Sequence, residues 1–388
     1  MIIKTNQSLQ LEDYSKRYQI PLLTLLLAND LTLNDDLPRY IKIPGYSLRQ
    51  IANHDDISDF PTELWPEILH INEVDTIQQL EEKINIFMPY KEKQFTYHDT
   101  PYTYDALCHD LHRLINLYPF IKKHLIGHSV CGKEIYELTI GCGKRQLHIN
   151  AGMHGNEWIT TAILMNFLNE YAVAVTDFNH LWHSYMIRSL KNVTLSIVAM
   201  VNPDGVNLAI NGCQQFPERS FDLLKMNNGR TDFANWKANI RGIDLNKQFP
   251  AAWHIEADRL NHVPAARDYA GSNPLTEPEV KALVQLTKKR NFQRVISLHT
   301  QGEEIYWYFG KNTPFESKAI SNEFARVSGY QPVKHLDNYA GFKDWFIQEY
   351  KRPGFTIELG RGKNPLSLRK FATIYMKTKR ILLANLYM

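Results

Sequence analysis

Cysteine is scarce in this 388-residue chain, and its spacing shows no pattern. The four residues are Cys108, Cys131, Cys142 and Cys213, and none of them belongs to a CxxC pair. A disulfide between any two of them therefore has no support, and we expect reduced thiols in a cytosolic compartment.

Long apolar runs are also missing. The first residues, MIIKTNQSLQLEDY, contain one lysine but no apolar core or cleavage site of a secretion signal. The most apolar stretch, Ile159 to Val175, is interrupted by Asn166, Asn169 and Glu170. Neither a signal peptide nor a membrane span is predicted, and we expect a cytoplasmic location.

Charge of one sign is not in excess. Lys and Arg number 44 against 41 Asp and Glu, a net charge of +3, and no long basic run occurs. Nucleic acid and anionic membranes are therefore not expected partners, and any anionic ligand must bind a local site. A hydrophobic content of 44% is ample for buried cores, and the length suggests two or three domains.

Residues 1–45 have the pattern strand, helix, helix, strand. The segments are IIK, SLQLEDYSKRY, PLLTLLLAND and RYIKIP. This sequence resembles a LysM module, with matches at Ser8, Leu9, Tyr18, Leu26, Asn29 and Ile43-Pro44. The resemblance implies binding of glycans that contain N-acetylglucosamine, and hence an association with the cell wall or spore. The alternative is a small helical cap that only packs on the rest of the chain.

Residues 46–91 resemble a second, more divergent copy. Its segments are YSLRQIA, LWPEILHIN and INIFMPY, with an acidic insertion, DDISDFPTE, expected between its helices. Repeated units suggest paired modules, and the charged residues that follow predict a linker over 92–100.

From residue 101 to 388, helical and strand-like patterns alternate, which predicts an α/β domain with a mixed twisted sheet flanked by helices. DALCHDLHRLINLYP and ITTAILMNFLNEYAV are expected helices. ELTIG, QLHINAG, LSIVAMV, RVISL and GFTIEL are expected strands. Several of these strands end in polar residues or glycine, where ligands sit in open α/β sheets.

One strand end carries a candidate metal site. After QLHINAG come His154 and Glu157, and a ring nitrogen and a carboxylate three positions apart can converge on one cation. This spacing alone is common by chance, so it needs further support. His299 closes the strand RVISL and is a candidate third ligand. Taken alone, such a histidine is more often a capping or core residue.

The motifs GMHGNEWIT, NPDG, GIDLN, SLHTQGE and FTIEL occur in the order typical of zinc metallocarboxypeptidases, and residues 101–388 resemble that family. The resemblance implies one Zn²⁺ per chain, held by His154, Glu157 and His299. It makes Glu358 the general base toward the attacking water and Asp244 the partner that orients His154. These roles suit the residue types, because metal-bound imidazoles need a second hydrogen-bond partner.

Departures from the family pattern bear on the substrate. Digestive members carry arginine at the positions of Asn156 and Lys247, beside Asn246, and a further arginine where this chain has Lys237. By resemblance Lys237 stabilises the oxyanion. A lysine is a point charge rather than a planar fork, so recognition of a terminal carboxylate should be altered. Each lysine has the alternative of being an ordinary surface charge.

The segments around Asp244 and Glu358, with paired modules in front, resemble the γ-D-glutamyl-meso-diaminopimelate peptidase branch of the family. That resemblance implies hydrolysis of peptidoglycan stem peptides. Such substrates carry several carboxylates, and the candidate binders are Lys247, Lys343, Arg361 and, by a looser match, Tyr339. The alternatives are a conventional carboxypeptidase and an inert wall-binding protein. The choice between diaminopimelate and lysine, and the oligomeric state, stay open.

Overall fold

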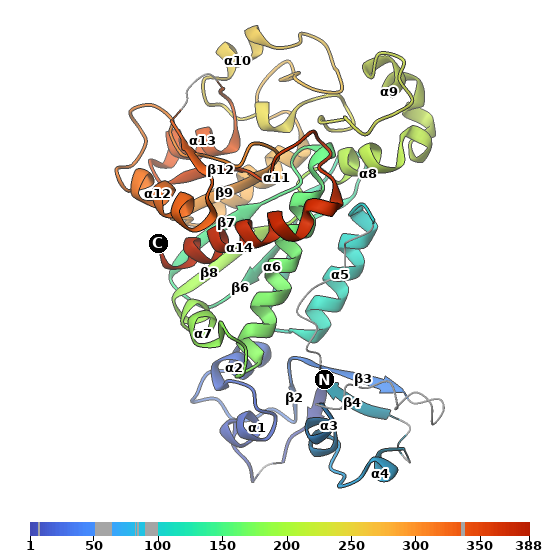
Figure 1. Ribbon diagram of the computed structural model, residues 1–388, viewed down its shortest axis with the longest axis vertical. Coiled ribbons are helices and arrows are strands. Elements are labelled where there is room, and N and C mark those ends of the chain that lie inside the picture. Colours follow the sequence, from blue (N-terminus) through green and yellow to red (C-terminus); the bar gives the residue numbers. More distant parts are fainter. Residues whose placement is uncertain (7, 51–63, 82, 84, 90–99, 335–337) are drawn as a thin grey trace.

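The computed structural model describes residues 1–6, 8–50, 64–81, 83, 85–89, 100–334 and 338–388. Its N-terminal residues form two small units at one end of a larger body (Figure 1). The first has the predicted order of elements: β1 Ile2–Lys4, α1 Leu11–Arg17, α2 Leu22–Asn29 and β2 Tyr40–Lys42, with β1 antiparallel to β2. Its identity as a LysM-like module stays a prediction.

The second unit repeats this order with β3 Tyr46–Gln50, α3 Trp65–Ile71, α4 Ile77–Glu81 and β4 Asn85–Pro89. The expectation that the acidic insertion lies between two helices was wrong. Tyr46–Gln50 is a strand, because it pairs along its whole length with β4, so the insertion lies between β3 and α3. The insertion itself, and all but the last residue of the predicted linker 92–100, lie outside the described residues.

The first unit packs against the larger body through buried contacts. Thr24 Oγ1 donates to the carbonyl oxygen of Val175 at 2.7 Å, and the Gly45 amide donates to that of Leu117 at 2.8 Å. Ala28 of α2 is fully buried in the same hydrophobic core as the helices of the body. In Figure 1, α2 accordingly lies at the end of the long helix α6 Ile159–Thr176. These contacts give the first unit a structural role as a packed part of the molecule.

The body is built on an eight-stranded mixed sheet, which confirms the predicted architecture. The order across the sheet is β11-β10-β12-β9-β7-β8-β6-β5. The central strands β12, β9, β7 and β8 run parallel to one another. Strand β10 pairs antiparallel with β12 and parallel with β11, and β6 pairs antiparallel with both β8 and β5. The strands are β5 Lys122–His128, β6 Glu134–Ile140, β7 Arg145–Asn150, β8 Val193–Val198, β9 Arg294–His299, β10 Glu304–Tyr306, β11 Gln331–Val333 and β12 Gly354–Glu358.

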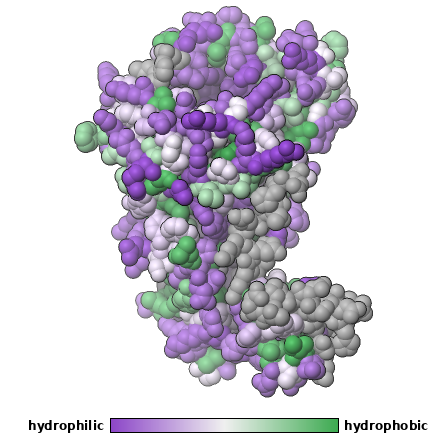
Figure 2. Space-filling model, viewed as in Figure 1, coloured by the Kyte–Doolittle hydropathy of each residue, from purple (hydrophilic) through white to green (hydrophobic). Residues whose placement is uncertain are grey.

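Helices cover both faces of this sheet (Figure 1). One hydrophobic core joins it to α5 Tyr104–Leu117, α6, α7 His183–Asn192, α12 Glu316–Ser328 and α14 Phe371–Tyr387. A second core joins the opposite face to α11 Pro278–Lys289 and α13 Phe342–Tyr350. The remaining helical segments are α8 Pro203–Asn211, α9 Ser220–Met226, α10 Trp253–Arg259 and the 3-10 turns Gly155–Glu157, Cys213–Gln215, Pro217–Arg219, Leu245–Lys247 and Leu368–Lys370. The face shown in Figure 2 is mostly hydrophilic, with hydrophobic residues scattered over it.

Helix α6 is buried along its whole length, which accounts for its nearly continuous apolar sequence. The charge of Glu170 is compensated inside, because Lys379 Nζ and Tyr375 Oη from α14 donate to its carboxylate at 2.9 and 2.5 Å. A buried carboxylate without such partners would be strongly destabilising. In the described part of the chain, no helix combines the length and the apolar character needed to cross a membrane.

A chain of buried polar side chains crosses the central strands. His148 Nδ1 lies 3.0 Å from Ser196 Oγ, which donates to Glu137 at 2.7 Å, and Asn150 Nδ2 lies 3.4 Å from His148 Nε2. Arg290 completes one end with two hydrogen bonds to Glu137. Burial lowers the pKa of His148 to about 3, so the folded protein holds this ring neutral.

We predict that His148 makes the fold sensitive to acid. In the unfolded chain His148 binds a proton below pH 6.5, whereas in the folded chain it does so only near pH 3. The free energy of unfolding therefore keeps the full contribution of the neutral ring above pH 6.5 and loses it as the pH falls toward 3. At pH 5 the loss is about 2 kcal/mol. Urea unfolding at pH 7.5 and pH 5 should show a smaller acid-induced loss for His148→Gln than for the parent chain. Equal losses would contradict the prediction.

Candidate metal and peptidase site

The candidate site lies where three parallel strands end. Glu358, the last residue of β12, stands opposite His299, the last residue of β9, in the parallel register. Strand β7 lies on the other side of β9 and ends at Asn150, a few residues before His154 and Glu157. Because the carboxyl ends of parallel strands share one edge of a sheet, residues far apart in sequence meet there.

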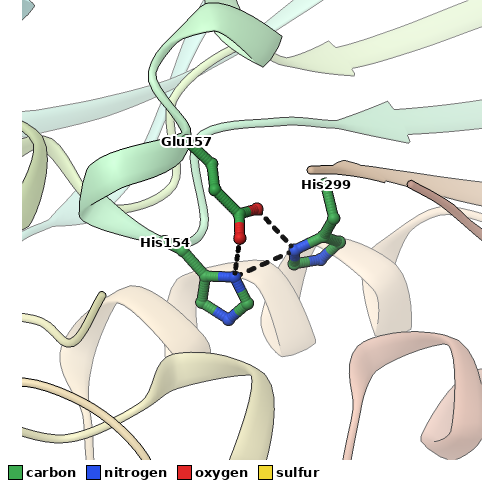
Figure 3. A group of neighbouring side chains, drawn as sticks. All are labelled: His154, Glu157 and His299. Atoms are coloured by element: carbon green, nitrogen blue, oxygen red, sulfur yellow. Dashed lines mark hydrogen bonds and ion pairs between the residues drawn. The ribbon is translucent and has the colours of Figure 1, made fainter. Parts of the chain in front are cut away.

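Three buried side chains converge at this edge (Figure 3). His154 Nδ1 lies 2.9 Å from Glu157 Oε1, and His299 Nδ1 lies 3.1 Å from Glu157 Oε2. The two Nδ1 atoms are themselves 3.1 Å apart. Each of the three side chains is at most 4% exposed.

This group fits a tetrahedral metal ion. Zinc bonds of 2.0–2.1 Å in tetrahedral geometry place neighbouring ligand atoms about 3.3 Å apart, close to the spacing found here. Two imidazoles and one carboxylate are also a common donor set for catalytic zinc, which leaves a fourth position open. Among the described residues, this is the one cluster of histidine, cysteine, aspartate or glutamate side chains with such geometry.

Asp244 contacts the ring nitrogen of His154 that does not face Glu157. Its Oδ1 lies 3.1 Å from His154 Nε2, and its Oδ2 lies 2.9 Å from Lys237 Nζ. Although burial opposes ionisation, the Lys237 ammonium and His154 hold the pKa of Asp244 well below its usual range. The ionised carboxylate thus fixes the ring so that Nδ1 points at the metal position, which is the arrangement predicted for Asp244. Lys237 lies in the same network, within reach of the site.

Two further residues hold Glu157, and neither was identified from the sequence. The Thr300 amide donates to Glu157 Oε2 at 3.1 Å, and Asn364 Nδ2 lies 3.5 Å from Oε1. Asn364 also donates to the Thr300 carbonyl oxygen at 2.9 Å. The position of Thr300 directly after His299 could have indicated its role, whereas nothing in the sequence around Asn364 points to Glu157.

Glu358 lines a cavity of about 220 Å³ beside the metal position. Loss of solvation, together with the nearby charge of Glu157, raises the pKa of Glu358 to about 8. Its Oε2 has no hydrogen-bond partner in the described part of the chain, so this oxygen is available to a ligand. A bound cation would stabilise the ionised form of this carboxyl.

The same cavity contains an ion pair formed by Lys343 and Asp344, both at least nine-tenths buried. Lys343 Nζ also donates to the Tyr308 carbonyl oxygen at 3.1 Å. Asn246 lines this cavity as well, and its Oδ1 accepts from the Phe342 amide at 3.1 Å. Two of the predicted substrate-binding residues, Lys343 and Asn246, therefore lie beside Glu358.

Asn156 is buried beside the metal ligands. Its Nδ2 lies 3.5 Å from the Asn235 carbonyl oxygen, and its Oδ1 has no hydrogen-bond partner among the described residues.

The other predicted binders do not line this cavity, although Lys247 Nζ contacts Asn338, which does. Lys247 is buried in an ion pair with Glu256, and the Tyr339 amide donates to the same carboxylate at 3.1 Å. Arg361 is exposed, and its Nε lies 3.2 Å from Glu303 Oε2. The substrate roles of these three residues stay predictions.

Comparisons with known proteins agree with this geometry. Residues 107–382 match the family model described as zinc carboxypeptidase. The chain is 47% identical over 287 residues to gamma-D-glutamyl-L-diamino acid endopeptidase 1 of Lysinibacillus sphaericus, covering 74% of this chain and 72% of that protein. It is 42% identical over 290 residues to the uncharacterized protein YqgT of Bacillus subtilis, covering 74% and 77%.

Solved structures share the fold at low sequence identity. The thrombin-activatable fibrinolysis inhibitor superposes with a TM-score of 0.61 at 19% identity, covering 76% of each chain. Carboxypeptidase A from Helicoverpa armigera gives 0.58 at 15% identity, covering 88% of this chain and 97% of that one. Because the zinc carboxypeptidase model matches most of this chain, and three side chains converge as a metal site requires, the chain belongs to the zinc carboxypeptidase family.

Proposed function

We propose that this protein is a zinc-dependent peptidase that hydrolyses the γ-D-glutamyl-meso-diaminopimelate bond of peptidoglycan stem peptides. The observation that carries the proposal is the buried group of His154, Glu157 and His299 with Glu358 beside it. The substrate follows from the relative named as a γ-D-glutamyl-L-diamino acid endopeptidase, together with the charged cavity next to Glu358.

Each residue has a defined task in this reaction. His154, Glu157 and His299 would hold one zinc ion, which when bound acidifies water and polarises a carbonyl group. Glu358 takes a proton from the attacking water and passes it to the leaving amine. Lys237, held by Asp244, is positioned to offset negative charge that develops on the scissile carbonyl oxygen.

The cavity beside Glu358 suits a side chain that carries both charges. The distal end of diaminopimelate has an ammonium and a carboxylate, whereas lysine has only the ammonium. Asp344 and Lys343 present the complementary pair of charges in a confined space. We assign the distal carboxylate to Lys343 rather than to Lys247, since Lys343 itself lines this cavity, whereas Lys247 only contacts one of its lining residues, Asn338.

The N-terminal units would add contact with the polymer. Two successive strand–helix–helix–strand units, and the text that resembles LysM modules, support binding of N-acetylglucosamine-containing glycan. Such binding would raise the local concentration of stem peptides at the site. We propose a cytoplasmic enzyme that meets wall or spore material through these units.

Digestion of defined peptides tests the proposal. L-Ala-γ-D-Glu-meso-diaminopimelate should be cut at the γ-D-glutamyl bond, with the products read by mass spectrometry. Release of C-terminal residues from ordinary peptides, without cleavage of the γ-linked substrate, would instead identify a conventional carboxypeptidase.

Metal binding and proton transfer should separate in two variants. His299→Ala should lose zinc, because two remaining ligands cannot retain the ion, whereas Glu358→Gln should keep it. Turnover of Glu358→Gln should fall ~100-fold or more, since an amide cannot accept the proton. Zinc content by mass spectrometry and single-turnover kinetics measure the two effects. Full zinc in His299→Ala, or near-normal turnover in Glu358→Gln, would contradict the assignments.

Replacing Lys343 should change the choice of substrate. Lys343→Met is expected to lower kcat/KM for the diaminopimelate peptide about tenfold or more, because the distal carboxylate loses its charged partner. The corresponding lysine peptide should be affected much less. Lys288→Met, on the exposed side of α11, is the matched control. Equal losses on both peptides would mean that Lys343 only supports the fold.

Glycan binding is best tested in the full-length Glu358→Gln chain, because the first unit shares the core of the body and its removal would expose apolar surface. This variant should sediment with insoluble sacculi, and soluble N-acetylglucosamine oligomers should release it. Release by free stem peptide but not by sugar oligomers would show that the N-terminal units do not bind glycan.

A further inference from the structure

A wide groove lies beside α9 and the loop at residues 261–267, away from the cavity of Lys343. It encloses about 1030 Å³, and its lining contains one acidic residue, Asp222. Its six basic lining residues, all exposed, are Arg219, Lys225, Arg230, Arg241, Arg267 and Lys363. The net charge of the whole chain is only +3, so this groove concentrates positive charge.

Most of these cations are not neutralised by the protein. Arg241 faces Glu277 at 3.6 Å, and Arg267 faces Asp268 at 3.1 Å. The other four form no ion pair with any residue in the described part of the chain. A concave surface with several unpaired cations attracts a ligand that carries several negative charges.

The groove adjoins the metal site. Lys363 directly precedes Asn364, whose amide lies 3.5 Å from Glu157 Oε1. Asn235, another lining residue, accepts a hydrogen bond from Asn156, the neighbour of Glu157. Within the described ranges, the groove shares no lining residue with the cavity that contains Glu358 and Lys343. If that cavity binds the diamino acid, the groove is free to bind the part of the substrate on the acyl side of the scissile bond.

We propose that this groove binds an acidic chain on the acyl side of the scissile bond, an inference that rests on the proposed function. The acyl residue of a γ-D-glutamyl substrate already carries a free carboxylate, and further γ-linked glutamates would each add one. The ligand class is therefore a peptide with several carboxylates before the scissile bond. None of the described residues that line the groove is aromatic, which argues against single-stranded nucleic acid, since its bases stack on aromatic rings.

Two peptides and two variants test the proposal. The short peptide is L-Ala-γ-D-Glu-meso-diaminopimelate, and the extended one carries several further γ-linked glutamates on the acyl side. The groove variant is Arg219→Gln, Lys225→Gln and Arg230→Gln combined. Its control removes the same charge from exposed positions on α11, with Lys281→Gln, Lys288→Gln and Lys289→Gln.

The parent chain should prefer the extended peptide, and the groove variant should lose about tenfold in the ratio of kcat/KM for extended over short peptide. The control should keep the ratio of the parent. A second readout is independent of turnover: fluorescence anisotropy of labelled extended peptide with the Glu358→Gln chain. Affinity should fall steeply with added salt and should fall further when the groove substitutions are combined with Glu358→Gln.

Equal use of both peptides by the parent chain, or equal behaviour of groove variant and control, would overturn the proposal. Competition by inorganic polyphosphate or an oligonucleotide as strong as that of the peptide would also overturn it, in favour of a general anion surface. Failure to cleave the short peptide refutes the proposed function instead, because the anisotropy measurement still reports on the groove.

Discussion

The parallel alignment of β7, β9 and β12 is the constraint on which the rest of the site depends. The register fixes Glu358 opposite His299, and the turn after β7 brings His154 and Glu157 to the same edge. Backbone hydrogen bonds of a buried sheet are costly to break, so the positions of His299 and Glu358 do not depend on loop conformation. The candidate metal ligands and Glu358 are thus brought together by the fold itself.

Buried charge is the cost of this arrangement, and the structure compensates it locally. Glu157 receives hydrogen bonds from the Thr300 amide and from Asn364, while Asp244 has both His154 and Lys237. An isolated buried carboxylate would instead become neutral. Glu358 is the member of the group with an unpartnered oxygen and a raised pKa, and a bound cation would favour its ionised form.

The sequence predicted the central strands, the helices α5 and α6 and, with the family resemblance, the three converging side chains, because each of these leaves a periodic pattern or a polar residue at a strand end. Three strands of the eight-stranded sheet were missed: the edge strand β5, and β10 and β11, which have three residues each and leave no such pattern. The hydrogen-bond and ion-pair partners of the site residues could not be predicted from the sequence. Asn364 and Glu157 are 207 residues apart, and only the folded chain shows that Lys343 pairs with Asp344 while Lys247 pairs with Glu256. The acidic insertion was wrongly placed between two helices, because only the pairing of Tyr46–Gln50 with β4 shows that the segment before it is a strand.

Helix α6 connects the candidate metal site to the first N-terminal unit. It starts two residues after Glu157 and ends at Thr176, next to the residue that accepts the hydrogen bond of Thr24. A buried helix of 18 residues is a rigid rod on the order of 27 Å long. The first N-terminal unit and the metal position are therefore held at a fixed spacing. If that unit binds a sugar strand as proposed, the stem peptides that reach the site are those that branch from the strand about one helix length away.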